Sequence, residues 1–270
     1  MMLSAARIAA MERATLDAVP PQQREALGDW LLGIDDGVVS RARSATPLQH
    51  GPQMADTVDR VAQRYAHAGQ PALFRVPDTA GLRAVSERLA ALGYLPASPT
   101  LVQCADAAPV LQSVASQPHA EGSVTGSAFK VTLLDTPDEA WCALFLGDGV
   151  GAGAGAGAGE AEAASRTRIL RRAQHAVYAQ VQVEGETVAT GMGSYSEGWA
   201  SVHGMRTRPA HRGQGYAGAI VRALAREALR RQLPQMFLQV EQSNTGAQAL
   251  YRRLGFEDLW LYRYWAAPAR

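Results

Sequence analysis

An internal repeat is the feature that most constrains the fold of this chain. Residues 71–105 and 234–266 follow one pattern: a strand, a short polar turn, a helix ending in Leu-Gly-aromatic, and a second strand. A further helix is predicted ahead of each, at 54–69 and at 215–232. Self-similarity of this kind is the signature of a duplicated structural unit. The sequence therefore predicts two copies of one α/β unit.

The boundary between the two copies is expected just ahead of the second set of patterned elements. We expect an N-terminal domain over residues 1–122 and a C-terminal domain over residues 123–270. Gly147–Ser165 is rich in Gly-Ala pairs, which offer no side chains to pack, so a flexible loop is expected there. Apolar patterned sequence begins before this loop, at Phe129, so the loop is assigned to the interior of the second domain.

The C-terminal copy is expected to contain elements in the order β-α-α-β-β-β-α-β-α-β. Thr136 is expected to cap the first helix, with Pro137 in its first turn, and Gly255 to follow the last helix as its C′ residue. The expected ranges are 129–134, 136–147, 165–172, a hairpin over 176–195 that turns at Glu184-Gly185-Glu186, 198–207, 215–232, 235–241, 244–255 and 256–265.

Composition excludes several classes of protein. The 270 residues are 47% hydrophobic, and 26 Lys and Arg against 25 Asp and Glu give a net charge of +1, which argues against a nucleic-acid partner. No apolar run reaches the roughly 18 residues of a membrane helix, and no signal peptide is indicated, so no membrane association and a cytoplasmic location are expected. Cys104 and Cys142 lie far apart, and we expect reduced core thiols with no disulfide and no metal site.

Two phosphate-binding patterns overlap in the stretch from His211 to Ile220. From Gly213 it reads G-x-G-x-x-G, the dinucleotide fingerprint, and Glu241 stands near the place of the acid that binds a ribose. From Arg212 it reads R-x-x-G-x-A, which holds a pyrophosphate on backbone N–H groups at a helix start. In both patterns the glycines let backbone N–H groups at a helix start approach a phosphate, so only the surrounding sequence can distinguish the two patterns.

Three observations favour the second pattern. The residues "RPAHR" separate the preceding strand from the glycines, which does not make a tight strand-to-helix turn. Fewer than 30 residues follow Glu241, too few for the further units of a doubly wound sheet. The strands before the loop are consecutive hairpin strands and hence antiparallel. The first copy has no equivalent loop before its helix, so only the second copy is expected to bind a phosphate.

The residues around this loop resemble motif A of the GNAT superfamily, the Gcn5-related N-acetyltransferases. The family pattern is V-x-P-x-x-R-G-x-G-x-G/A, and Thr207 stands in the Val position. The other matching positions are Pro209, Arg212, Gly213, Gly215 and Ala217. The sequence "LQVEQSNTGAQALYRRLGF" resembles motif B. The resemblance covers roughly residues 127–270 and implies an α/β (α+β) GNAT fold, a mixed and mainly antiparallel sheet flanked by helices. The repeat implies this fold twice in tandem, with a degenerate first copy.

The resemblance implies acetyl-CoA as co-substrate and no metal. Backbone N–H groups of residues 213–218 would hold the pyrophosphate, helped by the dipole of the following helix. Backbone groups of Met205 and Thr207 would hold the pantetheine arm, and one of them would serve as an oxyanion hole. The cofactor-binding residues implied are Met205, Thr207, Arg212, Gly213, Gln214, Gly215, Tyr216, Ala217, Gly218 and Asn244.

The resemblance also implies the chemistry. Tyr251 matches the family tyrosine that protonates the leaving thiolate as general acid. Asn244 is expected either to contact the cofactor or to cap the following helix, and the two roles are compatible. The general base stays open between His203, Glu197 and Glu241. Relatives that use a glutamate base carry it earlier on the strand, where this chain has Trp199 and Ala200.

The function expected is an N-acetyltransferase that acts by direct transfer in a ternary complex, because no cysteine lies near the motifs. The acceptor is expected to be a small-molecule or peptide amine. A non-catalytic acyl-CoA-binding regulator and, more remotely, an NAD(P)-dependent oxidoreductase are the alternatives. The chain is expected to be a monomer whose halves form an intramolecular pseudo-dimer, or a homodimer. The loop Gly147–Ser165 is expected to line or cover the acceptor entrance.

Overall fold

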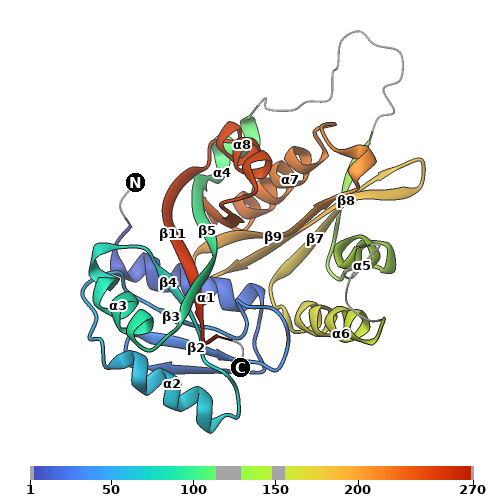
Figure 1. The fold of residues 1–270 in the computed structure, drawn as a ribbon. Coiled ribbons are helices and arrows are strands. Elements are labelled where there is room, and N and C mark those ends of the chain that lie inside the picture. Colours follow the sequence, from blue (N-terminus) through green and yellow to red (C-terminus); the bar gives the residue numbers. More distant parts are fainter. Residues whose placement is uncertain (1–2, 114–128, 148–155, 269–270) are drawn as a thin grey trace.

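The computed structural model describes residues 3–113, 129–147 and 156–268. Within these ranges all the strands belong to one sheet, in the order β1-β2-β3-β4-β11-β5-β10-β9-β8-β7-β6 (Figure 1). The strands are β1 (Gln23–Leu27), β2 (Trp30–Ile34), β3 (Ala45–Pro47), β4 (Leu73–Pro77), β5 (Leu95–Asp106), β6 (Lys130–Leu134), β7 (Ala176–Val183), β8 (Glu186–Ser196), β9 (Trp199–Thr207), β10 (Gln235–Glu241) and β11 (Glu257–Ala266). Most neighbouring strands are antiparallel, as expected, and only β3–β4 and β9–β10 are parallel.

Helices cover both faces of this sheet. They are α1 (Ala5–Ala18), α2 (Thr57–His67), α3 (Arg83–Ala91), α4 (Ala107–Gln112), α5 (Glu139–Leu146), α6 (Ala156–Arg172), α7 (Tyr216–Arg230) and α8 (Thr245–Arg253), with 3₁₀ turns η1 (Ala80–Leu82) and η2 (Pro209–His211). Helix α7 packs on one face of β8 and β9, while α1 and α5 lie on the other face (Figure 1). No helix in the described ranges has the length and apolar character needed to span a bilayer.

The repeat is visible in the structure, but its two final strands have changed places. In sequence, β4-α3-β5 and β10-α8-β11 are equivalent units. In the sheet β4 pairs with β11, and β10 pairs with β5, both antiparallel. The exchanged strands also pair with each other, for example at Leu101 and Leu261. The two halves therefore share one uninterrupted set of ladders through the middle of the sheet.

The local patterns explain why the C-terminal elements form where expected. The face of α7 that carries Ile220, Val221 and Leu224 is fully buried against the sheet. The β7–β8 hairpin turns through Glu184 and Gly185, both with positive φ, which is the geometry of a tight two-residue turn. Gly255, at φ +95°, lies just beyond the end of α8, as expected of a C′ glycine.

Two local expectations are wrong. Thr136 does not cap α5: the cap is Asp138, whose carboxylate accepts a hydrogen bond from the Trp141 N–H at 2.7 Å. The segment Gly147–Ser165 is not a loop throughout, because α6 begins at Ala156 and its Ser165 is buried against the first copy. The rest of that segment, 148–155, and the proposed domain boundary at 122/123 lie outside the described residues.

Candidate active site

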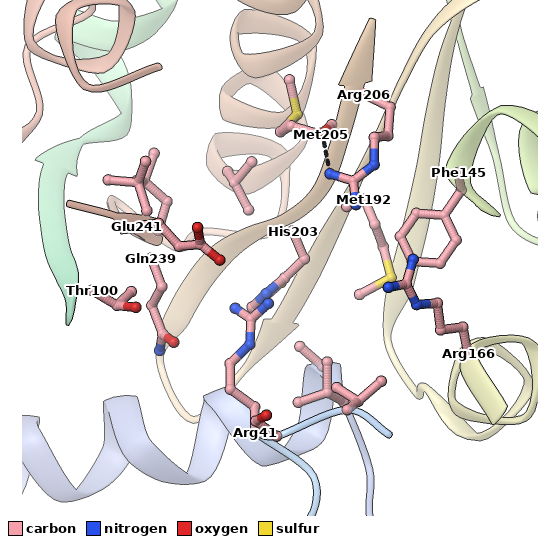
Figure 2. Close-up of a pocket in the computed structure, with 18 of the residues that line it drawn as sticks. Arg41, Thr100, Phe145, Arg166, Met192, His203, Met205, Arg206, Gln239 and Glu241 are labelled. Carbon is pink, nitrogen blue, oxygen red and sulfur yellow. Dashed lines mark hydrogen bonds between the residues drawn. The ribbon is translucent and has the colours of Figure 1, made fainter. Parts of the chain in front are cut away.

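The site begins where β9 and β10 separate. The two strands pair in parallel from Ala200 and Met236 to Val202 and Leu238, and beyond these residues no further pairing joins them. The β8–β9 ladder carries a bulge at this level, where Gly204 takes a positive φ of +61°. A bulge bends a strand and redirects its groups. A cavity of about 520 Å³ opens here (Figure 2).

The bulge explains which β9 side chains reach the cavity. Successive residues of a regular strand point to opposite faces, yet His203, Met205 and Arg206 all line it. Gly191 on β8 makes room for Met205, because a Cβ at that position would lie 2.4 Å from the Met205 sulfur. Thr207, also expected to bind the cofactor, is the last paired residue of β9, opposite Ala189, and does not line the cavity.

The glycine loop lies between η2 and α7. Gly213 and Gly215 have φ of +77° and +82°, in the left-handed region that favours glycine. The first α-helical hydrogen bond runs from the Ala219 N–H to the Gly215 carbonyl, and a helix leaves its preceding N–H groups without an internal acceptor. Arg212, Gly213 and Gln214 are exposed. This geometry suits an anion held by backbone N–H groups at a helix start.

The side chains of the loop have different surroundings. Tyr216 is buried with its ring 4.8 Å from that of Phe129, and its hydroxyl donates to the Gln214 side chain at 2.8 Å. Gly218 is buried in the first turn of α7, and Ala217 is half-buried. The Tyr216 side chain therefore anchors the loop to the core, and the backbone of Tyr216 forms the first residue of α7.

Helix α8 brings two predicted residues to the same cavity. Tyr251 is 7% exposed, packs against Phe256 with ring centroids 6.0 Å apart, and lines the cavity. Burial raises the pKa of its hydroxyl to about 12. Asn244 caps α8, its side-chain oxygen accepting from the Ala247 N–H at 3.1 Å, and it also lines the cavity. The capping role of Asn244 is thus confirmed.

The three candidate bases lie in different environments. His203 is 5% exposed, and neither ring nitrogen has a hydrogen-bond partner among the described residues. Burial, with a smaller contribution from the charge of Arg41, lowers the pKa of His203 to about 3, so the ring is neutral near pH 7 and a weak base. Glu241 ends β10 and points into the cavity (Figure 2). The expectation that Glu197 faces the cleft is wrong: it lies in the β8–β9 turn and pairs with Arg13 at 2.9 Å.

Three arginines that line the cavity were not predicted from the sequence. Arg41 comes from the first copy, Arg166 from α6 and Arg206 from β9 (Figure 2). Burial lowers the pKa of Arg206, with nearby Arg166 acting in the same direction. The guanidinium of Arg206 lies 6.0 Å from the ring centroid of Phe145. Regular alternation predicts that His203 and Arg206 face opposite sides of β9, and the bulge between them brings both to the face that α5 covers, while Met205 packs toward α7.

The other walls of the cavity come from both copies. Gln239 and Tyr262 are joined by a hydrogen bond of 2.9 Å, and the Gln239 amide donates to the Thr15 hydroxyl of α1 at 3.0 Å. Ala18 and Val19, at the end of α1, complete this side. Helix α6 contributes Arg166, Ile169 and Leu170. This part of the cavity wall therefore comes largely from α1, α6 and the strands β10 and β11.

Comparisons with solved structures show the same fold. A GCN5-related N-acetyltransferase from Kribbella flavida matches with a TM-score of 0.69 at 18% identity, over 100% of this chain and 98% of that one. A functionally unknown conserved protein from Staphylococcus epidermidis matches with a TM-score of 0.63 at 10% identity, over 94% and 98%. A tandem GNAT protein from the clavulanic acid biosynthesis pathway matches with a TM-score of 0.57 at 14% identity, over 99% and 98%.

The comparison with protein families covers nearly the whole chain. Residues 5–265 match the family described as "Probable histone acetyltransferase Rv0428c C-terminal". The match includes the exchanged strands, the glycine loop and both cavity walls. The resemblance found in motifs A and B is confirmed, as is the tandem fold class. The chain belongs to this family of GNAT-type acetyltransferases.

Proposed function

We propose that this protein transfers an acetyl group from acetyl-CoA directly to a primary amine in a ternary complex. One observation carries the proposal: the parted ends of β9 and β10 and the Tyr251 side chain line one cavity, and the glycine loop begins α7, the helix that packs on β9. The loop would supply backbone N–H groups for an anion, the parted ends of β9 and β10 would supply unpaired strand edges, and Tyr251 would supply a proton.

The residues of the loop fit a pyrophosphate. Nothing lies within 4 Å of where a Gly213 Cβ would be, so the backbone is open to an approaching ligand. The N–H groups of residues 213–218 would hold the phosphates, and the exposed Arg212 would add a charge-assisted contact. Beyond Val202 and Leu238, the edges of β9 and β10 are free to pair with the pantetheine arm, as expected for Met205.

The chemistry needs one proton removed and one supplied. The amine nitrogen attacks the thioester carbon, and a backbone N–H near Met205 stabilises the negative oxygen that forms. As the carbon–sulfur bond breaks, Tyr251 gives its proton to the thiolate. Glu241 carries the only carboxylate among the described residues that line the cavity, and we assign it to accept the amine proton through water. His203, neutral and a weak base, is assigned a hydrogen-bonding role toward the acceptor.

Titration calorimetry with acetyl-CoA, followed by release of the CoA thiol with a panel of amines, tests the proposal. The panel includes free amino acids, peptides and a histone-tail peptide, since the family description names a histone acetyltransferase. Tyr251→Phe should bind acetyl-CoA normally and turn over slowly. Tyr94→Phe is the control, because Tyr94 packs on Phe74 in the first copy, away from the cavity. No acetyl-CoA binding would refute the proposal.

The alternatives give different results in the same experiment. Binding of acetyl-CoA without thiol release on any amine would favour a non-catalytic acyl-CoA-binding regulator. Binding of a nicotinamide cofactor instead would favour an oxidoreductase. Sedimentation of the full chain distinguishes a monomer from a homodimer.

A further inference from the structure

We propose that the acceptor of this enzyme carries an anionic group, a carboxylate or a phosphate, beside its amine, and that Arg41 binds that group. The proposal rests on the proposed acetyl transfer and names its substrate class. It begins from a side chain that the first copy of the repeat contributes to the cavity of the second (Figure 2).

Arg41 has no counter-ion among the residues that the structure describes. Within these residues it makes no hydrogen bond and no ion pair, whereas most of the other described arginines are paired with a carboxylate. Its guanidinium lies beside His203, which is neutral and offers no negative charge. Charge without a counter-ion in a partly enclosed cavity is costly, and an arriving anion offsets the cost.

The segment that carries Arg41 is held in place. The Asp35 carboxylate accepts from the Gly37 N–H at 2.8 Å and pairs with Arg172 of α6 at 2.6 Å. The Val38 N–H donates to the Ser165 hydroxyl at 3.0 Å. These contacts tie the segment before Arg41 to α6, and a group held this way loses little freedom on binding a ligand.

The cavity as a whole is positive. Arg41, Arg166 and Arg206 line it, and among the residues that the structure describes Glu241 supplies the one carboxylate that lines it. Arg166 is paired with Glu162 at 2.5 Å, and Arg206 donates to the Met205 carbonyl at 3.2 Å, so Arg41 is the cation best able to turn to a ligand. A guanidinium holds a carboxylate or phosphate with two parallel hydrogen bonds. A peptide rich in Lys and Arg would meet repulsion here.

The same charges favour the reaction. Nearby positive groups lower the pKa of an amine, which increases the neutral form that attacks the thioester. When Arg41 holds the anionic group of a small amino acid or amino phosphate, that anion is neutralised and no longer favours the protonated form of the amine beside it.

The test compares matched acceptors on the wild-type protein. Alanine is set against alaninamide, and phosphoethanolamine against ethanolamine, by thiol release at saturating acetyl-CoA. Each kcat/KM is expressed per concentration of neutral amine, because the anionic group raises the pKa of the amine beside it. We expect kcat/KM to be about 10- to 100-fold higher for the anionic member of one pair, the size of a hydrogen bond to a charged group. Which pair shows the preference distinguishes carboxylate from phosphate. Equal rates within both pairs, or a preference for the neutral members, would overturn the proposal.

Variants assign the preference to Arg41. Arg41→Gln should erase it, mainly through KM, while leaving the acetyl-CoA affinity unchanged, and Arg41→Lys should restore part of it. Arg43→Gln, in the same segment but not lining the cavity, should keep the full preference. Titration calorimetry measures the affinity of Arg41→Gln and Arg43→Gln for alanine and phosphoethanolamine, and so tests the anion site even without turnover. If Arg41→Gln binds these ligands as tightly as Arg43→Gln does, the anion site is refuted. Absence of acetyl-CoA binding, in contrast, refutes only the proposed function.

Discussion

The buried ion pair between Glu12 and Arg75 leads to a quantitative prediction about how α1, which lines one side of the cavity, is held in place. Glu12 lies on α1 and Arg75 on β4, their charged atoms are 2.5 Å apart, and their side chains are 2% and 1% exposed. The Arg75 Nε already lacks a partner among the described residues, and its guanidinium lies 5.2 Å from the ring centroid of Tyr262. Glu12→Leu would leave Arg75 charged, buried and without an acceptor. Breaking a buried pair in this way costs about 3–5 kcal/mol in the free energy of unfolding.

Urea unfolding, followed by circular dichroism, measures this cost in Glu12→Leu, Arg75→Met and the double variant. The double variant should regain most of the loss, because two apolar side chains of similar volume need no counter-charge. Arg13→Gln, which breaks an exposed pair on the same helix, is the control and should change stability far less. Since α1 carries Ala18 and Val19 to the cavity, KM for the acceptor should rise more than KM for acetyl-CoA. A single variant as stable as the wild type, or a double variant worse than both singles, would refute the reasoning.

Three further predictions concern the cofactor loop, the proton donor and a helix cap. Tyr251→Phe should lower kcat about 10²-fold, as expected for a lost general acid. Because burial raises the pKa of Tyr251 to about 12, the donor stays protonated from pH 6 to 10, and a pH–rate profile of the wild type should show no alkaline fall from this group below about pH 10. Gly213→Ala should strain a backbone at φ +77° by about 1–2 kcal/mol and weaken acetyl-CoA binding in calorimetry, whereas unchanged affinity would contradict the loop assignment. Asp138→Ala removes the α5 cap and also the acceptor of the buried Gln180 amide at 2.9 Å, so it should lower the free energy of unfolding by about 2–3 kcal/mol, measured in urea, with Thr136→Ala as a silent control.

The sequence predicted the C-terminal copy well because its elements carry strong local patterns. The glycine loop, the apolar face of α7 and the strand–helix–strand unit that ends in β11 are each encoded within a continuous stretch of no more than 32 residues. The residues RPAHR, which argued against a dinucleotide turn, include the 3₁₀ turn η2, Pro209–His211. The site residues carried over by resemblance stay predictions, although Tyr251, Asn244 and Met205 do line one cavity.

What the sequence could not predict depends on contacts between distant segments. The units β4-α3-β5 and β10-α8-β11 look alike locally, so nothing in either indicates that their last strands change places. The glycines of the Gly-Ala run disfavour a helix, but Ala and Glu before Ser165 favour one, and the contacts of Ser165 and Arg172 with the segment around Asp35 hold α6 in place. The residues next to Arg41 in the sequence do not distinguish it from an ordinary surface arginine. It lies beside His203 only because the segment around Asp35 packs against α6.

The exchange of β5 and β11 also has a consequence for how the chain folds during synthesis. Strand β5 leaves the ribosome long before its neighbours β10 and β11, which occupy residues 235–266, near the C-terminus. Until then both of its edges lack partners, and unpaired edges invite pairing with other chains. The middle of the sheet is therefore completed last, through contacts between residues far apart in sequence, which slows folding. A nascent first copy should need shielding from aggregation until the strands of the second copy are available to pair with β5.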